Sequence, residues 1–244
     1  MAESGENPPP VPPSGGADVG EALKWSWQVF SRRPGPMVVP GLAILIVTVI
    51  GTALIIAGVF WMVPSSVDGD YGQTAATDGF AVGGLILVIV VALLLVFAVI
   101  YLQGAVTSGV IRVADGRSVG VRDFLVPTRT AAFVGTVILM AIIIAVGFVL
   151  LVIPGLIAVF ALQYAPVYVL ERKMSPTQAV AASARLAFAK PLDSLLVLLV
   201  HYVYGYIGGV AFGLGAVVTL PMGEAFLVHC YRNLVGRPIP PGVA

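Results

Sequence analysis

Four long stretches of this chain contain no Lys, Arg, Asp or Glu, and they restrict its fold more than any other feature. They cover residues 37–63, 79–111, 130–170 and 194–223. About 20 apolar residues in a helix cross the hydrocarbon core of a bilayer. Within lipid, only helices and closed barrels satisfy the backbone polar groups. The stretches therefore predict a helical membrane protein that crosses the bilayer several times.

The lengths of these stretches predict six spans. The third is long enough for two crossings, which Pro154 and Gly155 separate, and the last continues to Tyr231 with a glycine-rich turn at its centre. The predicted fold is an all-α membrane protein with six transmembrane helices arranged as three hairpins. The fourth span is short and carries Pro166, so we expect a re-entrant or strongly distorted segment there. The predicted spans are residues 37–63, 80–111, 130–153, 156–170, 192–213 and 215–232.

The basic residues predict the orientation. All 13 Lys and Arg residues fall within 24–33, 112–129, 172–190 and 232–237, whereas the polar loop 64–79 carries only acidic charges. Threading the chain through a bilayer places every basic residue on one face, as the positive-inside rule describes. Ten Arg against three Lys, with heavy use of Ala, Val and Gly, suggests a GC-rich bacterial genome. We therefore expect a protein of the bacterial cytoplasmic membrane with both termini in the cytoplasm.

Short polar segments precede the hairpins on the basic side. Residues 19–32 form an amphipathic pattern after a capping Asp18, and 175–190 begin with the capping sequence Ser175-Pro176-Thr177-Gln178. The middle segment, 118–129, is weaker because Pro127 interrupts it. We expect these segments to lie in the membrane interface and to form a degenerate threefold repeat with the hairpins. This membrane domain covers 18–236, between a disordered proline-rich cytoplasmic tail (1–17) and a second tail (237–244).

Composition argues against several classes of function. A net charge of +1 gives no support to nucleic-acid binding. With one Cys and two His, neither an internal disulfide nor a protein-only zinc site is expected. Asp68-Gly69-Asp70 resembles the start of a calcium loop but lacks the Glu at its twelfth position, so a solvated turn is expected. No catalytic or cofactor-binding motif occurs. The sequence therefore predicts no cofactor and no metal, and gives no sign of an enzyme.

Five of the six predicted spans carry a hydrogen-bonding side chain at a similar depth. Each lies seven to nine residues from a charged residue on the basic side, which is about 12 Å along a helix. An ionisable group at that depth is costly and needs a partner. We expect His201 to pair with Glu224, with Gln163 as the next candidate. The five residues of this predicted polar layer are Glu224, His201, Gln163, Gln103 and Thr136.

A glycine row lies in the same region. Gly205, Gly209 and Gly213 recur every four residues, and His201 continues the row one turn earlier. Such a row predicts close packing against a neighbouring helix. Two interpretations of the polar layer remain open. It is either a proton-relay or ligand-binding layer, or a set of interhelical hydrogen bonds that fix the packing, each contributing about 0.6 kcal/mol.

Several short motifs resemble those of a known family. They are Ile153-Pro154-Gly155-Leu156, Tyr164-Ala165-Pro166-Val167 before Glu171, Ser175-Pro176 with Ala179 and Ser183, Tyr231-Arg232-Asn233-Leu234, and Trp25 with Phe30 in the opening helix. Over about residues 18–236, the chain resembles the bacterial YciC-like integral membrane family. It is also similar to the membrane domain fused to some glycerophosphodiester phosphodiesterases. The resemblance implies six spans with interfacial helices. It implies no activity, because these membrane domains offer no catalytic residues to carry over, and the soluble phosphodiesterase module does not occur in the matching residues.

The sequence thus predicts a non-enzymatic structural, assembly or lipid-associated membrane component. Its expected partners are the lipid bilayer and either other membrane proteins or further copies of itself. One alternative is a small transporter or channel that uses the polar layer around Glu224. The other is a lipid-active membrane enzyme.

Overall fold

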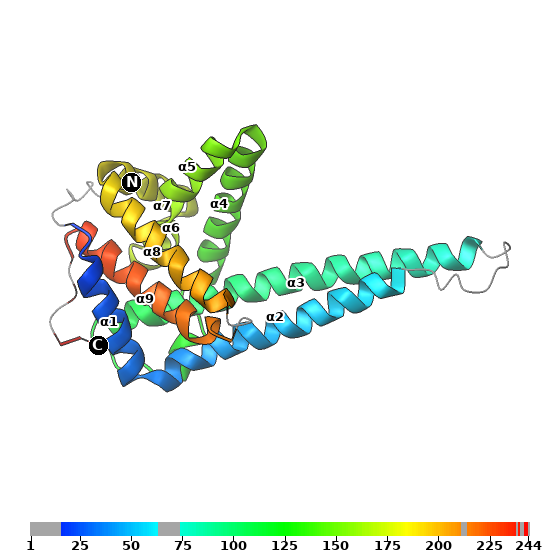
Figure 1. Ribbon diagram of the computed structural model, residues 1–244, viewed down its shortest axis with the longest axis horizontal. Coiled ribbons are helices and arrows are strands. Elements are labelled where there is room, and N and C mark those ends of the chain that lie inside the picture. The colour runs from blue at the N-terminus through cyan, green and yellow to red at the C-terminus, as the bar shows by residue number, and fades with distance from the viewer. Residues whose placement is uncertain (1–15, 63–73, 211–213, 238, 240–241, 244) are drawn as a thin grey trace, which may run out of the picture.

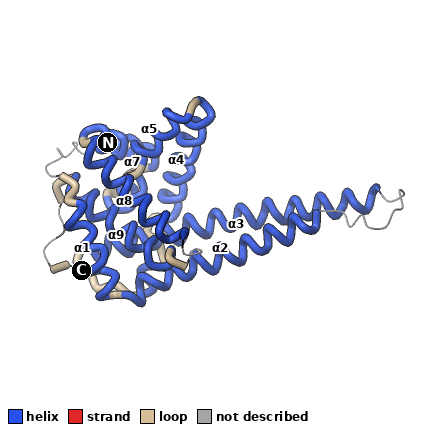
Figure 2. Tube along the Cα trace, in the orientation of Figure 1, coloured by secondary structure: helices blue, strands red, loops and turns tan. Residues whose placement is uncertain are grey.

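The computed structural model describes residues 16–62, 74–210, 214–237, 239 and 242–243. The predicted N-terminal tail and the loop with Asp68 and Asp70 lie almost wholly outside these residues. Every regular element in the described part is helical (Figure 2). In chain order the elements are α1 (Val19–Arg32), α2 (Pro34–Met62), α3 (Thr74–Ala114), the 3₁₀ turn η1 (Val121–Phe124), α4 (Thr130–Leu150), α5 (Val152–Leu162), α6 (Ala165–Glu171), α7 (Pro176–Ala189), α8 (Pro191–Val210) and α9 (Ala216–Leu234).

Two apolar arms leave a compact helical bundle. Helices α2 and α3 lie side by side and form a long arm that reaches away from the bundle, while α4 and α5 form a shorter arm in another direction (Figure 1). Large apolar side chains are exposed along both arms, a degree of exposure that soluble proteins rarely show. Both arms therefore have surfaces suited to lipid. These exposed side chains include Ile46, Ile50, Phe60, Trp61, Leu93, Leu94, Val149 and Leu150.

Five helical segments are long and apolar enough to cross a membrane, judged by length and composition. They are Pro34–Trp61, Val82–Ala114, Thr130–Leu150, Val152–Glu171 and Pro191–Val210. These segments indicate a multi-pass membrane protein. They overlap the first five predicted spans.

The sixth predicted span, α9, has a different character and is not among these five segments. It packs against α1, α2, α3 and α8, and 14 of its 19 residues are buried. The sequence predicted a transmembrane span here, at residues 215–232. Neighbouring helices cover α9, so it can carry Glu224, His229 and Arg232. The six-helix hairpin arrangement is therefore not confirmed, and α9 is the central helix of the bundle.

The fourth predicted span is broken, in agreement with the expected distortion. Helix α5 ends at Leu162 and α6 begins at Ala165. At the break, the Ser183 hydroxyl donates to the Ala161 carbonyl at 2.7 Å and accepts from the Tyr164 amide at 3.0 Å. This satisfies backbone groups that an unbroken helix would pair itself. Pro166 lies in the first turn of α6, where a missing N–H costs little.

The predicted amphipathic helices form with their predicted caps. Asp18 accepts a hydrogen bond from the Glu21 amide at 2.8 Å at the start of α1. Ser175 and Gln178 form a reciprocal capping box at the start of α7. Helix α1 turns Ala22, Trp25 and Val29 inward, where they are buried. Its packing against α9 leaves Leu23 and Trp27 exposed.

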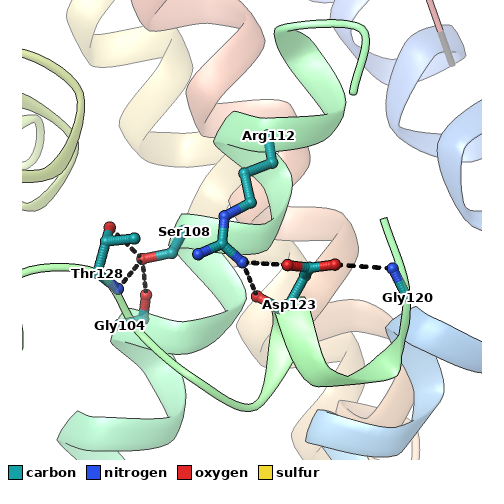
Figure 3. Close-up of polar contacts among 6 residues, drawn as sticks. All are labelled: Gly104, Ser108, Arg112, Gly120, Asp123 and Thr128. Carbon is teal, nitrogen blue, oxygen red and sulfur yellow. Dashed lines mark hydrogen bonds and ion pairs between the residues drawn. The ribbon is translucent and has the colours of Figure 1, made fainter. Parts of the chain in front are cut away.

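The middle segment, 118–129, contains only η1 and a loop, and side chains hold this loop against the end of α3 (Figure 3). Arg112 pairs with Asp123 at 2.5 Å, and the Asp123 carboxylate also accepts from the Gly120 amide. The hydroxyls of Ser108 and Thr128 lie 3.1 Å apart. The segment therefore acts as a tethered loop rather than a third amphipathic helix, as Pro127 suggested.

Candidate functional site

The strongest candidate site is the buried carboxylate of Glu224 on α9. One of its oxygens accepts from the Thr107 hydroxyl at 2.9 Å, and the other from the Gln103 amide at 3.4 Å. Gln103 and Thr107 lie one turn apart on α3, so they present both donors on the same face. Thr107 is fully buried and Glu224 is only 7% exposed. The contact joins the central helix to the base of the long arm, inside the candidate span Val82–Ala114.

The donors that hold Glu224 are neutral. No Lys, Arg or His in the described part of the chain forms an ion pair with its carboxylate. Nor do three His, Cys, Asp or Glu side chains of the described residues form a group able to hold a metal ion. With neutral donors on both oxygens, the arrangement suits a proton-binding acid or an interhelical tie.

His201 lies beside Glu224 without bonding to its carboxylate. The Nδ1 atom of His201 is 3.3 Å from the carbonyl oxygen of Gly223. We expected the two side chains to lie within hydrogen-bonding reach, directly or through one water, and the described residues show no direct hydrogen bond between them. The two helices do meet at the expected depth. Successive residues of a helix point about 100° apart, so Gly223 faces α8 while Glu224 faces α3.

The other members of the predicted layer bond elsewhere. Gln163 donates to the carbonyls of Phe160 and Ser194, at 3.0 and 3.1 Å, and so joins the end of α5 to the start of α8. Thr136 donates to the Ala132 carbonyl of its own helix at 2.8 Å. Among the five predicted residues, the structure brings only Gln103 to Glu224. Thr107 was not among the predicted residues, although its position one helical turn after Gln103 indicated that the two side chains share a face.

Close packing between α8 and α9 involves a glycine outside the predicted row. A Cβ atom added to Gly205 or Gly209 would meet nothing within 4 Å, whereas one on Gly208 would lie 2.9 Å from the Cα of Ala216. Gly213 lies outside the described residues. A strict four-residue row drifts about 40° per step around a helix. The buried face of α8 instead follows alternating steps of three and four residues along the chain. Tyr204 and Gly208 lie on this face, one step of four residues apart.

A second polar cluster gathers around Arg232, near the end of α9. Its guanidinium pairs with Asp115 at 2.6 Å and Glu171 at 3.3 Å, and it donates to the Ala114 carbonyl at 2.8 Å. Arg237 adds a longer contact of 3.6 Å to Glu171. Arg232 is 6% exposed. This cluster ties together the ends of α3, α6 and α9.

Further contacts bring the separate basic segments to this same end of the bundle, which we call the basic end. The Arg33 guanidinium donates to the Arg117 carbonyl at 3.4 Å. Arg129 donates to the carbonyls of Val169 and Met174. The basic end thus comprises α1, the α3–α4 loop, the α6–α7 turn, α7 and the end of α9.

The basic end also contains a cavity of about 180 Å³ between α1 and α9. The indole N–H of Trp25 donates to the Val243 carbonyl at 2.5 Å along one side. The Trp25 and His229 rings have centroids 5.4 Å apart. The lining residues, Glu21, Lys24, Trp25, Gln28, His229, Ile239, Gly242 and Val243, do not include the Glu224 cluster.

The contacts of Glu224 lead to a testable prediction. We expect Glu224→Leu to lower the free energy of unfolding by about 1–3 kcal/mol, because it leaves the Gln103 amide without its partner. Glu224→Gln keeps an acceptor for Thr107 and should cost less. The double variant Glu224→Leu/Gln103→Leu should recover most of the loss, since both partners become apolar. Unfolding by SDS titration in mixed micelles measures all three. If the unfolding free energies showed that Glu224 is coupled to His201 rather than to Gln103, this assignment would be contradicted.

Comparison with known proteins finds mycobacterial relatives. The chain is 28% identical over 253 residues to "Uncharacterized protein Rv2560" of Mycobacterium tuberculosis (strain ATCC 25618 / H37Rv), covering 96% of this chain and 77% of the relative. The same identity and coverage hold for "Uncharacterized protein Mb2590" of Mycobacterium bovis (strain ATCC BAA-935 / AF2122/97). No protein-family model matches the chain, and no solved structure matches it significantly. The chain is thus similar, over almost its whole length, to proteins encoded by mycobacteria.

Proposed function

We propose that this chain is a polytopic protein of a bacterial cytoplasmic membrane and serves there as a non-enzymatic structural, assembly or lipid-associated component. The observation that carries this proposal is the use of the polar side chains in its predicted spans. Glu224, Gln103, Gln163 and His201 each bond to a neighbouring helix. Side chains committed in this way stabilise helix packing. The similarity to mycobacterial proteins supports a bacterial membrane.

We further propose that α9 is the sixth crossing. A helix covered by other helices needs no apolar surface for lipid, and 14 of its 19 residues are buried. Its contacts with α3 also run at matching depths. Glu224 meets Thr107, and eight residues later Arg232 meets Ala114 and Asp115. Six crossings would put both termini on the same side of the membrane, and the positive-inside rule favours the cytoplasm for that side and for the basic end.

Reporter fusions test this topology. A fusion after Asp70 should read as external, and fusions after Gly120, Met174 and Gly236 should read as cytoplasmic, because the basic segments stay on the inner face. Paired phosphatase and fluorescent-protein fusions report the two sides with opposite signals. An external reading at Gly236 alone would leave five crossings and exclude α9 as a span. An external reading at Gly120 would overturn the whole arrangement.

The alternative function is a small transporter, and two observations favour it. Glu224 is a buried acid without a cationic partner, and the α5–α6 helix is broken within a candidate span. Intramembrane acids and broken helices both occur in transport pathways.

Complementation of a deletion strain separates the two functions. Under the structural proposal, Glu224→Gln retains the fold and should restore the wild-type phenotype and lipid profile. Under the transport alternative it removes the titrating group and should fail, although the protein reaches the membrane at normal abundance. Failure at normal abundance would therefore overturn the structural proposal. Glu224→Leu serves as the fold-disrupting comparison.

A further inference from the structure

Most of the acidic side chains at the basic end are already engaged within the protein. Asp115 and Glu171 pair with Arg232, and Asp123 pairs with Arg112. The Asp193 carboxylate accepts from the Ala17 amide at 3.2 Å. The structure thus uses its acids to neutralise the arginines nearest the bundle.

Six exposed cations of the basic end remain uncompensated. Their side chains form no ion pair or hydrogen bond with any described residue. They come from α1, the α3–α4 loop, the α6–α7 turn and α7, so they surround the buried ionic cluster. Two acids on α1, Asp18 and Glu21, are also exposed at this end without an ion pair in the described structure. The six are Lys24, Arg32, Arg117, Arg122, Lys173 and Arg185.

Exposed apolar side chains accompany these cations on the same segments. On α1, Leu23 and Trp27 are 39% and 59% exposed and lie one turn apart, on one face of the helix. Val121 and Val126 are exposed in the loop that carries Arg122, and Phe188 and Leu192 are exposed after Arg185. Apolar residues beside unpaired basic residues are characteristic of helices that lie in an anionic membrane interface.

We propose that the basic end binds anionic phospholipid headgroups in the leaflet that it faces, with α1 lying in the headgroup plane. This inference rests on the proposed membrane function and adds the chemistry of its lipid partner. Leu23 and Trp27 enter the boundary between headgroups and acyl chains. Lys24, in the middle of α1, and Arg32, at its C-terminal end, attract lipid phosphates. Because Asp115, Asp123 and Glu171 are already paired with arginines, anionic lipid supplies the counter-charge for the exposed cations.

The intrinsic tryptophans allow a direct test on the full chain. The protein is placed in nanodiscs of equal parts phosphatidylcholine and phosphatidylglycerol, with bromine on the shallow acyl-chain positions of only one of the two lipids. The quenching of Trp27 is obtained as the difference in quenched tryptophan fluorescence between the wild type and the Trp27→Phe variant. This substitution changes an exposed position. Trp61, exposed on α2, serves as the internal reporter of membrane crossing.

Brominated phosphatidylglycerol should quench Trp27 severalfold more than brominated phosphatidylcholine, because each nearby Lys or Arg enriches anionic lipid. This excess quenching by brominated phosphatidylglycerol should shrink at high salt and in the double variant Lys24→Gln/Arg32→Gln. It should persist in the control Arg237→Gln, which removes a cation already paired with Glu171.

Each other outcome overturns a different statement. Equal quenching of Trp27 by the two lipids would reject the anionic preference and leave the membrane function intact. Quenching of Trp61 without Trp27 would place α1 away from the bilayer and reject the inference alone. An excess that survives Lys24→Gln/Arg32→Gln would show that these cations do not select the lipid. Quenching of neither tryptophan would reject the proposed membrane function as well.

Discussion

Replacement of Arg232 by Met is expected to lower the free energy of unfolding by about 3–5 kcal/mol, the range for breaking a buried ion pair by removing one partner. The guanidinium is 6% exposed and contacts Asp115, Glu171 and the Ala114 carbonyl. Met matches much of the side-chain volume but donates no hydrogen bond. Glu171, whose side chain is only 5% exposed, then loses its nearer cation and retains only the longer contact with Arg237.

SDS unfolding of the purified chain in mixed micelles measures this loss. The matched control is Arg237→Met, because Arg237 contacts the same carboxylate at 3.6 Å but its side chain is 57% exposed. An exposed pair of this kind contributes about 0–1 kcal/mol. Adding Glu171→Gln to Arg232→Met should recover part of the stability, since the stranded charge is gone. Equal losses for Arg232→Met and Arg237→Met would show that the cluster is not a buried tie.

Substitution of Gly41 by Ala should be the most damaging change to the attachment of the long arm. A Cβ atom on Gly41 would meet the backbone of Val217, with its carbonyl oxygen nearest and its Cα at 2.7 Å. Because the obstacle is backbone, α2 and α9 must move apart, and overpacking of this kind costs about 1–3 kcal/mol. Gly41→Leu should exceed that range. The same displacement should weaken the contact between Glu224 and α3.

Gly205→Ala is the control for this prediction. A Cβ on Gly205 meets nothing within 4 Å, and Ala is favoured over Gly within a helix by about 0.5–1 kcal/mol. Its unfolding free energy should therefore equal or exceed that of the wild type. Protease accessibility of the two arms gives a second measure, because detachment of the long arm should expose the α1–α2 junction. Equal stabilities for Gly41→Ala and Gly205→Ala would refute the close α2–α9 contact.

The local features of this fold were readable in the sequence because they depend on residues close together in the chain. Asp18 and Ser175 cap α1 and α7 as predicted, since capping involves residues only three positions apart. The long apolar stretches became α2, α3, α4 and α8 because their composition suits lipid on every side. Pro166 and Gly155 marked the distorted region for the same local reason.

The partners of the candidate site were less predictable, because they depend on how helices rotate about their own axes. Depth along a span placed Glu224, His201 and Gln103 at one level, and the structure agrees on that level for α3, α8 and α9. The depth of a residue along a helix does not determine the direction in which its side chain points. A change of one residue rotates a side chain by about 100°, which turns Glu224 from His201 toward Thr107. The glycine row was misread for the same reason.

The sequence by itself determined that this chain is helical, apolar enough to enter a membrane, and basic on only one side of its apolar stretches. Each of these properties follows from composition and short-range order, which any arrangement of the helices preserves. Only the tertiary structure decided that α9 is the covered centre of the bundle, that Glu224 bonds to α3, and that Arg232 neutralises Asp115 and Glu171. These contacts join residues more than 60 positions apart, and they form only where packing fixes the position and rotation of whole helices.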